Sequence, residues 1–155
     1  MRLVIRPTTE ADVAAAEQCL TDGKAALAAL GVPQWQSDYP NRIDIEEDMG
    51  HGASFVAVDG AWLTDSASSA PRYAVIHRCA VSAQASRRGV MSQMFLEGER
   101  LARAHGCESM RIDTHMRNVG LRGLAEKLGY TRCGTITLPY PEESDPLRIA
   151  FEKLL

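Results

Sequence analysis

The sequence predicts an α/β fold in which helices pack against a mixed β-sheet. Segments of β-type alternate with helical segments, and the chain ends in two β-type segments joined by a turn-rich loop. One helical segment repeats its apolar side chains with the spacing of a buried helix face. The 155 residues are enough for one domain with its own core, so we expect a single domain over residues 1–155.

The first half of the chain begins with a strand and a long helical region. Thr9 is a good N-cap for this region, and Asp12 in its first turn complements the helix dipole. The alanine-rich stretch favours a helix, which we expect to be interrupted near Gly23. The predicted elements are a strand at 3–6, a helical region at 10–30, a short acidic helix at 43–49, a strand at 54–58 and the start of a return strand at 61–63.

The second half of the chain is dominated by an amphipathic helix. Its apolar stripe includes Met91 and Leu101, and Gly106 supplies its C-terminal stop. Gly129 ends the following helix in the same way. The predicted elements are an apolar strand at 73–81, a helix at 90–105, a strand at 110–113, a helix that begins after Asn118, and strands at 130–138 and 147–154.

Composition places the chain among ordinary globular proteins. Hydrophobic residues make up 45% and charged residues 24% of the sequence, which excludes a disordered or collagen-like chain. The N-terminus lacks the features of a signal peptide, and no apolar stretch reaches the ~20 residues that cross a bilayer. We therefore expect a cytoplasmic protein with no membrane partner. The four cysteines contain no C-x-x-C pair, which favours reduced thiols, and we expect no metal.

Charge is distributed unevenly along the chain. Residues 1–71 contain 4 basic and 11 acidic side chains, residues 72–132 contain 11 and 5, and residues 133–155 contain 2 and 4. A basic middle between acidic segments suggests a centrally bound anion, although solvated arginines on helix faces would give the same count. We expect no nucleic-acid partner, because aromatic or groove-reading elements for it are missing.

The segment before the helix at 90–105 has the features of a phosphate site. A helix N-terminus offers unpaired N–H groups and about half a positive charge. Gly89 allows close backbone approach, and Arg87 and Arg88 add positive charge. The segment contains neither a Walker A motif nor the G-x-G-x-x-G motif of dinucleotide folds. We therefore expect a pyrophosphate at this end of the helix.

Motif A of the GNAT superfamily of N-acetyltransferases resembles the same segment. The sequence Val-Ser-Ala-Gln-Ala-Ser-Arg-Arg-Gly-Val-Met-Ser at 81–92 is similar to [Q/R]-x-x-G-x-[G/A], with Gly89 on the first motif glycine. Ser86 and Met91 replace the usual residues at two motif positions. Two downstream segments resemble the family's fifth strand, fourth helix and closing motif: Asp-Thr-His-Met-Arg-Asn at 113–118 and Leu-Ala-Glu-Lys-Leu-Gly-Tyr at 124–130. The resemblance covers nearly the whole chain.

The resemblance implies a mostly antiparallel mixed sheet with splayed central strands, helices on both faces, and acetyl-CoA as cosubstrate. Pantetheine would lie between the splayed strands. The cofactor-binding residues implied by the family are Cys79, Ala80, Val81, Arg87, Arg88, Gly89, Val90, Met91, Ser92 and Asn118. Asn118 serves equally well as a plain N-cap. Trp35 and Tyr39 resemble the substrate-side segment of one GNAT subgroup, with a role as core anchors as the alternative.

Acylation of an amine requires a base that removes a proton from the ammonium group. His77 matches a position where arylalkylamine acetyltransferases carry a histidine, and it is our first candidate; a hydrogen-bonded core histidine is the alternative. His115, at the end of a strand, is the second candidate base, and Tyr140 is a candidate acid. Ala125 stands where many family members have the tyrosine that protonates the leaving thiolate.

The resemblance implies direct transfer of an acetyl group from acetyl-CoA to a primary amine of a small molecule or peptide. The alternative is an acyl-CoA-binding regulatory module without turnover, which Ala125 favours and the two histidines oppose. A Cys79–His77 nucleophile pair and metal ligands at Asp113 and His115 are weaker alternatives. The family's third strand is hard to find between 61 and 71. The sequence does not identify the acceptor amine, and it does not decide whether the protein forms a homodimer.

Overall fold

The computed structural model describes residues 3–59, 73–138 and 145–155. Along the chain the helices and strands are β1 (Leu3–Pro7), α1 (Val13–Ala29), α2 (Arg42–Gly50), β2 (Phe55–Asp59), β3 (Tyr73–Val75), α3 (Val90–Ala104), β4 (Ser109–His115), α4 (Val119–Lys127), β5 (Thr131–Thr137) and β6 (Leu147–Leu154). The expected return strand at 61–63 and the candidate acid Tyr140 lie outside the described residues. None of the described helices is long and apolar enough to cross a bilayer.

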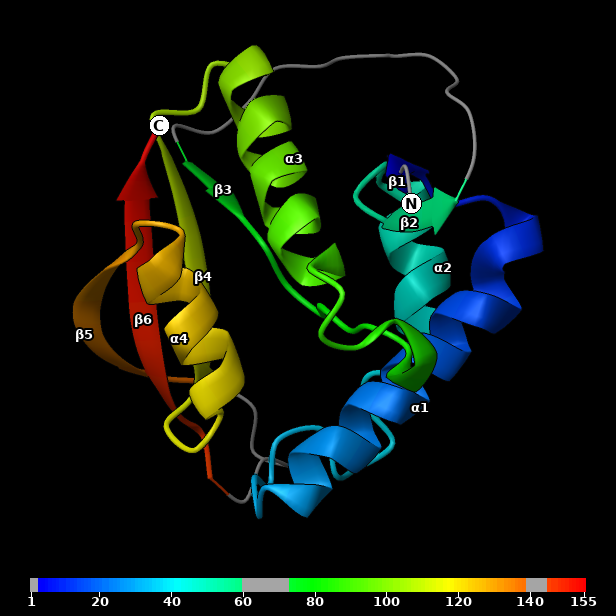
Figure 1. Ribbon diagram of the computed structural model, residues 1–155, viewed down its shortest axis with the longest axis horizontal. Helices are drawn as coiled ribbons and strands as arrows, with labels where there is room; N and C mark the ends of the chain where they lie inside the picture. Colours follow the sequence, from blue (N-terminus) through cyan, green and yellow to red (C-terminus); the bar gives the residue numbers. More distant parts are fainter. Residues whose placement is uncertain (1–2, 60–72, 139–144) are drawn as a thin grey trace.

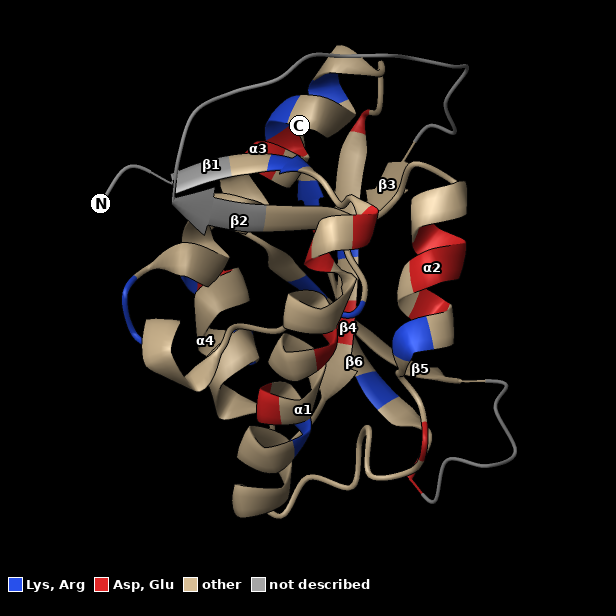
Figure 2. Ribbon diagram, turned by 90° about the vertical axis from the view of Figure 1, so that its right-hand side faces the viewer, with Lys and Arg blue, Asp and Glu red and all other residues tan. Residues whose placement is uncertain are grey.

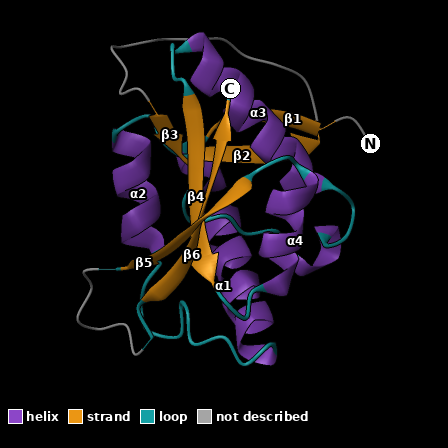
Figure 3. Cartoon of the chain, turned by 90° about the vertical axis from the view of Figure 1, so that its left-hand side faces the viewer, coloured by secondary structure: helices purple, strands orange, loops and turns teal. Residues whose placement is uncertain are grey.

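The described strands form a two-stranded antiparallel sheet of β1 and β2 and a four-stranded sheet in the order β3-β4-β6-β5 (Figure 3). The β3–β4 pair is parallel, whereas the other described pairs are antiparallel. The prediction of a mixed, mostly antiparallel sheet is therefore confirmed. The structure also places the parallel pair at one edge of the described sheet. Helix α3 follows β3 along the chain, and α4 follows β4.

Two hydrophobic clusters hold the helices in place. The first joins α3 and α4 to β4 and β6 through buried residues that include Phe95, Ala102, Met110, Ile112, Ala125, Tyr130, Ile149 and Phe151. The second joins α1, α2 and the loop between them through Val13, Leu20, Leu27, Val32, Trp35 and Ile45. The chain after β3 runs between these two groups of helices (Figure 1).

Helix α1 is continuous through Gly23, so the expected interruption there is wrong. A Cβ atom built on Gly23 would lie 3.2 Å from the Cβ of Ala80 and 3.3 Å from the Trp35 ring. The glycine is therefore explained by the close approach of the helix to the chain after β3. The helical cost of one glycine, about 1 kcal/mol, is small enough for packing to override.

A cluster around Asp12 joins β1 to the start of α1. Both terminal nitrogens of Arg6 donate to its carboxylate, at 2.7 and 2.8 Å. The backbone N–H and the hydroxyl of Thr9 also donate to it, at 2.9 and 2.6 Å. The Arg6 guanidinium is the largest cause that holds the pKa of Asp12 well below its usual range, and the Thr9 hydroxyl adds to it.

Replacing Asp12 with Asn should lower the free energy of unfolding at neutral pH by about 1–3 kcal/mol, because charge-assisted hydrogen bonds are lost. A depressed pKa contributes stability that is present above the unfolded-state pKa, near 3.9, and is lost as pH falls through the folded-state pKa. The difference between Asp12→Asn and the parent should therefore shrink below about pH 4. Urea unfolding of the parent and the variant, at neutral pH and below about pH 4, measures this difference in the free energy of unfolding. The exposed Glu10→Gln is the control. Equal stabilities at neutral pH would contradict this role of Asp12.

Candidate active site

The strands β3 and β4 pair over a short distance and then separate. Their ladder covers Tyr73–Val75, and the last bond runs from the Ile76 N–H to the Arg111 carbonyl at 3.1 Å. Strand β4 continues to pair with β6 as far as His115. Within the described residues, the chain from 77 to 81 makes no backbone hydrogen bond to another strand. The predicted strand at 73–81 is thus much shorter than expected, and the splay implied by the family resemblance is present (Figure 1).

Arg78 redirects the chain at the point of separation. Its backbone has a left-handed φ of 51°, which is uncommon for a residue with a side chain. Its guanidinium donates to Asp48 at 2.6 Å and to the Tyr39 hydroxyl at 3.1 Å, and lies 3.6 Å from Asp44. Acidic side chains gather on α2 (Figure 2). The acidic helix therefore binds an arginine of this chain, a role that sequence reasoning did not assign.

A cavity of about 360 Å³ lies between the separated strands. Helices α1, α3 and α4 and the loop after α1 complete its wall. Candidate residues that line it are Trp35, Tyr39, His77, Cys79, Ala80, Val81, Met91 and Asn118. The structure thus brings most of the predicted site residues around one space.

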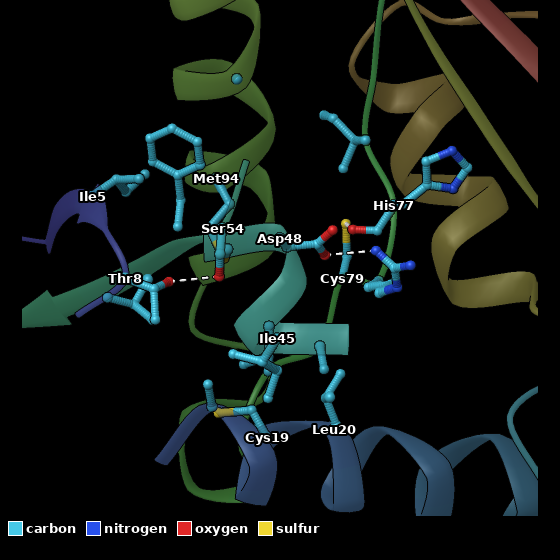
Figure 4. Close-up of a pocket in the computed structure, with 18 of the residues that line it drawn as sticks. Ile5, Thr8, Cys19, Leu20, Ile45, Asp48, Ser54, His77, Cys79 and Met94 are labelled. Atoms are coloured by element: carbon cyan, nitrogen blue, oxygen red, sulfur yellow. Dashed lines mark hydrogen bonds and ion pairs between the residues drawn. The ribbon is translucent and has the colours of Figure 1, made fainter. Parts of the chain in front are cut away.

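A second cavity of about 340 Å³ lies on the other side of the same chain segment (Figure 4). Residues of β1, α1, α2, β2 and α3 line it. Its polar contacts include a 2.7 Å hydrogen bond between the hydroxyls of Thr8 and Ser54. The His77 ring, although it borders both cavities, points away from Ile5, Thr8 and Met94 in Figure 4. We therefore consider His77 with the first cavity.

The loop before α3 has the geometry of an anion site. Arg87 and Gly89 both have left-handed φ angles, 61° and 78°, and α3 begins directly after Gly89 without a side-chain cap. Among the described residues, none accepts a hydrogen bond from the backbone N–H groups of residues 89–92. A Cβ on Gly89 would meet nothing within 4 Å. Unpaired amides beside open space, with the exposed Arg87 and Arg88, suit a phosphate group.

Asp22 of α1 holds the beginning of this loop. Its carboxylate accepts the backbone N–H of Ala83 at 2.7 Å, across 61 positions of sequence. This hydrogen bond is the largest cause that lowers the pKa of Asp22. Sequence reasoning missed Asp22, because a single acidic residue on a helix carries no signal of a partner so far along the chain.

His77 faces Asp113 across the gap between the strands. The Nδ1 atom of His77 lies 4.0 Å from the Oδ2 atom of Asp113. The side chain of His77 is 60% exposed, whereas that of Asp113 is 14% exposed. The His77 ring is therefore reachable from solvent and stands beside a largely buried carboxylate.

His115 has a different environment. It is buried, its Nδ1 accepts the backbone N–H of Arg117 at 3.1 Å, and its Nε2 lies 2.9 Å from the carboxylate of Asp145. Since Nδ1 accepts, the proton is on Nε2 and is donated to Asp145. That bond is the largest cause that lowers the pKa of Asp145. Both ring nitrogens are occupied and His115 does not line the cavity, which argues against it as the base.

The remaining candidates separate into lining and structural residues. The Asn118 side chain accepts the N–H of Leu121 at 3.2 Å and donates to Thr114 at 3.1 Å while lining the cavity, so it is at least an N-cap. Burial raises the pKa of the Cys79 thiol to about 12, and the thiol lies against the carbonyl of His77, which disfavours a Cys–His nucleophile. Ala125 is fully buried in the core and does not line the cavity.

Trp35 and Tyr39 lie on the loop between α1 and α2. Trp35 is buried in the second hydrophobic cluster, and Tyr39 is half-exposed and bound to Arg78. Both also line the cavity, so their positions are compatible with a role as core anchors and with a role on the substrate side. In the described part of the chain, no group of three His, Cys, Asp or Glu side chains is placed to hold a metal ion.

Comparison with known proteins agrees with this geometry. The model of the acetyltransferase (GNAT) family matches residues 23–130. A GNAT family acetyltransferase structure from Streptococcus agalactiae has a TM-score of 0.76 at 28% identity, over 99% of this chain and 95% of that one. A GNAT family acetyltransferase from Listeria monocytogenes shares the fold at a TM-score of 0.68 and 18% identity, over 99% and 95% of the two chains.

The ribosomal-protein-S5-alanine acetyltransferase from Vibrio fischeri also shares the fold, at a TM-score of 0.68 and 14% identity over 99% of this chain and 93% of that chain. No curated protein matches in sequence. The family model covers the separated strands, the start of α3 and α4, which all contribute residues to the wall of the cavity. This chain therefore belongs to the GNAT family and is an acyl-CoA-dependent acetyltransferase.

Proposed function

We propose that this chain transfers the acetyl group of acetyl-CoA to a primary amine by direct attack of the amine, with His77 as general base. The observation that carries the proposal is the joint lining of one cavity by the separated strands, by the first turn of α3 and by His77. A site for the donor and a proton acceptor for the amine are thus adjacent. The substrate is a small molecule or a peptide amine.

The residues present fit acetyl-CoA. Phosphate oxygens would accept from the unpaired N–H groups at the start of α3, near Arg87 and Arg88. The amide groups of pantetheine would pair with the backbone of 79–81, which lacks a strand partner within the described residues. Asn118 would form a hydrogen bond with the same pantetheine group of acetyl-CoA. Acetyl-CoA supplies the thioester that the amine attacks.

The chain itself would supply positioning and proton removal. An amine attacks only as the neutral species, so the ammonium must first lose a proton. The Nδ1 atom of His77 faces the gap, and the exposed ring can pass the proton on to solvent. The described residues that line the cavity include no tyrosine of α4, since Ala125 is in the core. Water would therefore protonate the departing thiolate, unless Tyr140 does so.

Gly89→Val should weaken acetyl-CoA binding by about tenfold or more, because a branched side chain would obstruct phosphate contact with the backbone. Gly106→Val is a matched control, since Gly106 has a similar φ of 73° at the other end of α3 and also meets nothing within 4 Å. Both substitutions place a side chain at a left-handed φ, so the Gly106 variant controls for backbone strain. Acetyl-CoA should raise the melting temperature of the parent and of the Gly106 variant, but hardly that of the Gly89 variant. Equal shifts in all three would contradict the phosphate site.

His77→Ala should lower kcat/KM by about 10²–10⁴-fold, as is typical for loss of a general base. The acidic limb of the pH–rate profile should disappear as well. Release of free CoA over a panel of primary amines measures both, with exposed His105→Ala as control. Unchanged kinetics would remove His77 from the mechanism, and a parent enzyme that releases no CoA with any amine would favour a regulatory acyl-CoA-binding module.

A further inference from the structure

Asp113 is the carboxylate that the proposed mechanism leaves unexplained. It lies on β4 opposite the point where β3 departs, and it lines the cavity. Its side chain is only 14% exposed, yet none of the described residues donates a hydrogen bond to it; the Nδ1 atom of His77 lies 4.0 Å from its Oδ2 atom. A largely buried carboxylate needs a partner, because burial without one is costly.

We propose that Asp113 binds the ammonium group of the acceptor and so selects primary amines that carry no carboxylate on the amine-bearing carbon. This inference rests on the proposed function and adds a substrate class to it. A carboxylate beside the amine would be placed next to Asp113, where like charges repel.

The distance between Asp113 and His77 supports a nitrogen atom between them. At 4.0 Å, Oδ2 and Nδ1 are too far apart for a direct hydrogen bond. A nitrogen at about 2.8 Å from each atom can bridge that separation, since two such bonds reach further than 4.0 Å. The two contacts would meet at about 90°, narrower than the tetrahedral angle of about 109°, so each N–H···acceptor bond would be slightly bent. The same ammonium can then donate one N–H to Asp113 and another to His77.

Other charged groups at the cavity do not compete for this role. Arg78 is bound by Asp48 and lies close to Asp44. Arg148 is completely buried, and its Nη1 atom donates to the carbonyls of Asp145 and Leu147. Apolar side chains, among them Leu27, Trp35 and Leu138, also line the cavity. The cavity therefore fits an ammonium attached to an apolar body.

The proton step that follows involves one bond broken and one formed. An N–H bond of the bound ammonium breaks, its electron pair stays on the amine nitrogen, and the proton bonds to Nδ1 of His77. The carboxylate of Asp113 remains ionised and keeps its hydrogen bond to the neutral amine. Asp113 is thus a binding residue that contacts the reacting nitrogen, whereas His77 is the base.

Phenethylamine and phenylalanine make a matched pair of probes, because they differ by one carboxylate on the amine-bearing carbon. The parent enzyme should acetylate phenethylamine with the higher kcat/KM, by about tenfold or more. Asp113→Asn should lower kcat/KM for phenethylamine by about 10- to 100-fold, and should reduce the preference over phenylalanine. The KM for acetyl-CoA should stay unchanged, which shows that the variant is folded.

Calorimetry of phenethylamine with enzyme saturated by CoA gives a readout without turnover, and Asp113→Asn should weaken this binding by about tenfold or more. The control is Glu152→Gln, which removes a carboxylate of β6 that is bonded to Arg111 and does not line the cavity. Three outcomes would overturn the inference about Asp113 and leave the proposed function standing. They are equal losses of kcat/KM for both probes in Asp113→Asn, unchanged binding of phenethylamine to that variant, and a parent enzyme that prefers phenylalanine. A parent that acetylates no amine overturns it together with the proposed function.

Discussion

The separation of the chain after β3 from strand β4 is the feature on which the rest of the site depends. A segment that leaves its sheet loses backbone hydrogen bonds, and other contacts must offset that loss. Here the guanidinium of Arg78 binds Asp48 on α2, and Gly23 lets α1 approach Ala80 closely. The second hydrophobic cluster thus holds the segment away from β4 and keeps a backbone edge open for a ligand.

Two consecutive residues of α1 support two successive parts of the site. Gly23 lies close to the segment after β3, and Asp22 accepts the backbone N–H of Ala83 at the start of the loop that precedes α3. The continuous helix therefore fixes the loop relative to the separated strand. This explains why α1 tolerates a glycine near its middle, where helix propensity alone would place an interruption.

The sequence was sufficient to predict most of the described helices and strands, because their signals are local. Apolar periodicity predicts α3, and Gly89 before that helix predicts the unpaired amides at its start. The position of Arg78, the bond between His115 and Asp145 and the contact of Asp22 with Ala83 could not be predicted, since each depends on residues far apart in sequence. The shortened β3 has the same origin: an apolar run predicts a strand, but not where its pairing ends.

The two histidines near the ends of the central strands show how burial and distance divide structural from chemical roles. Each has an aspartate neighbour, at 2.9 Å for His115 with Asp145 and at 4.0 Å for His77 with Asp113. The shorter pair is a completed hydrogen bond, with the second nitrogen of His115 also occupied by a backbone N–H. It stabilises the end of β4 and has no capacity left for a ligand. In the longer pair the carboxylate is largely buried and its hydrogen-bonding capacity is unused within the described residues. An incoming cation can therefore satisfy Asp113 without first breaking an existing bond, which is the condition for a preorganised binding site.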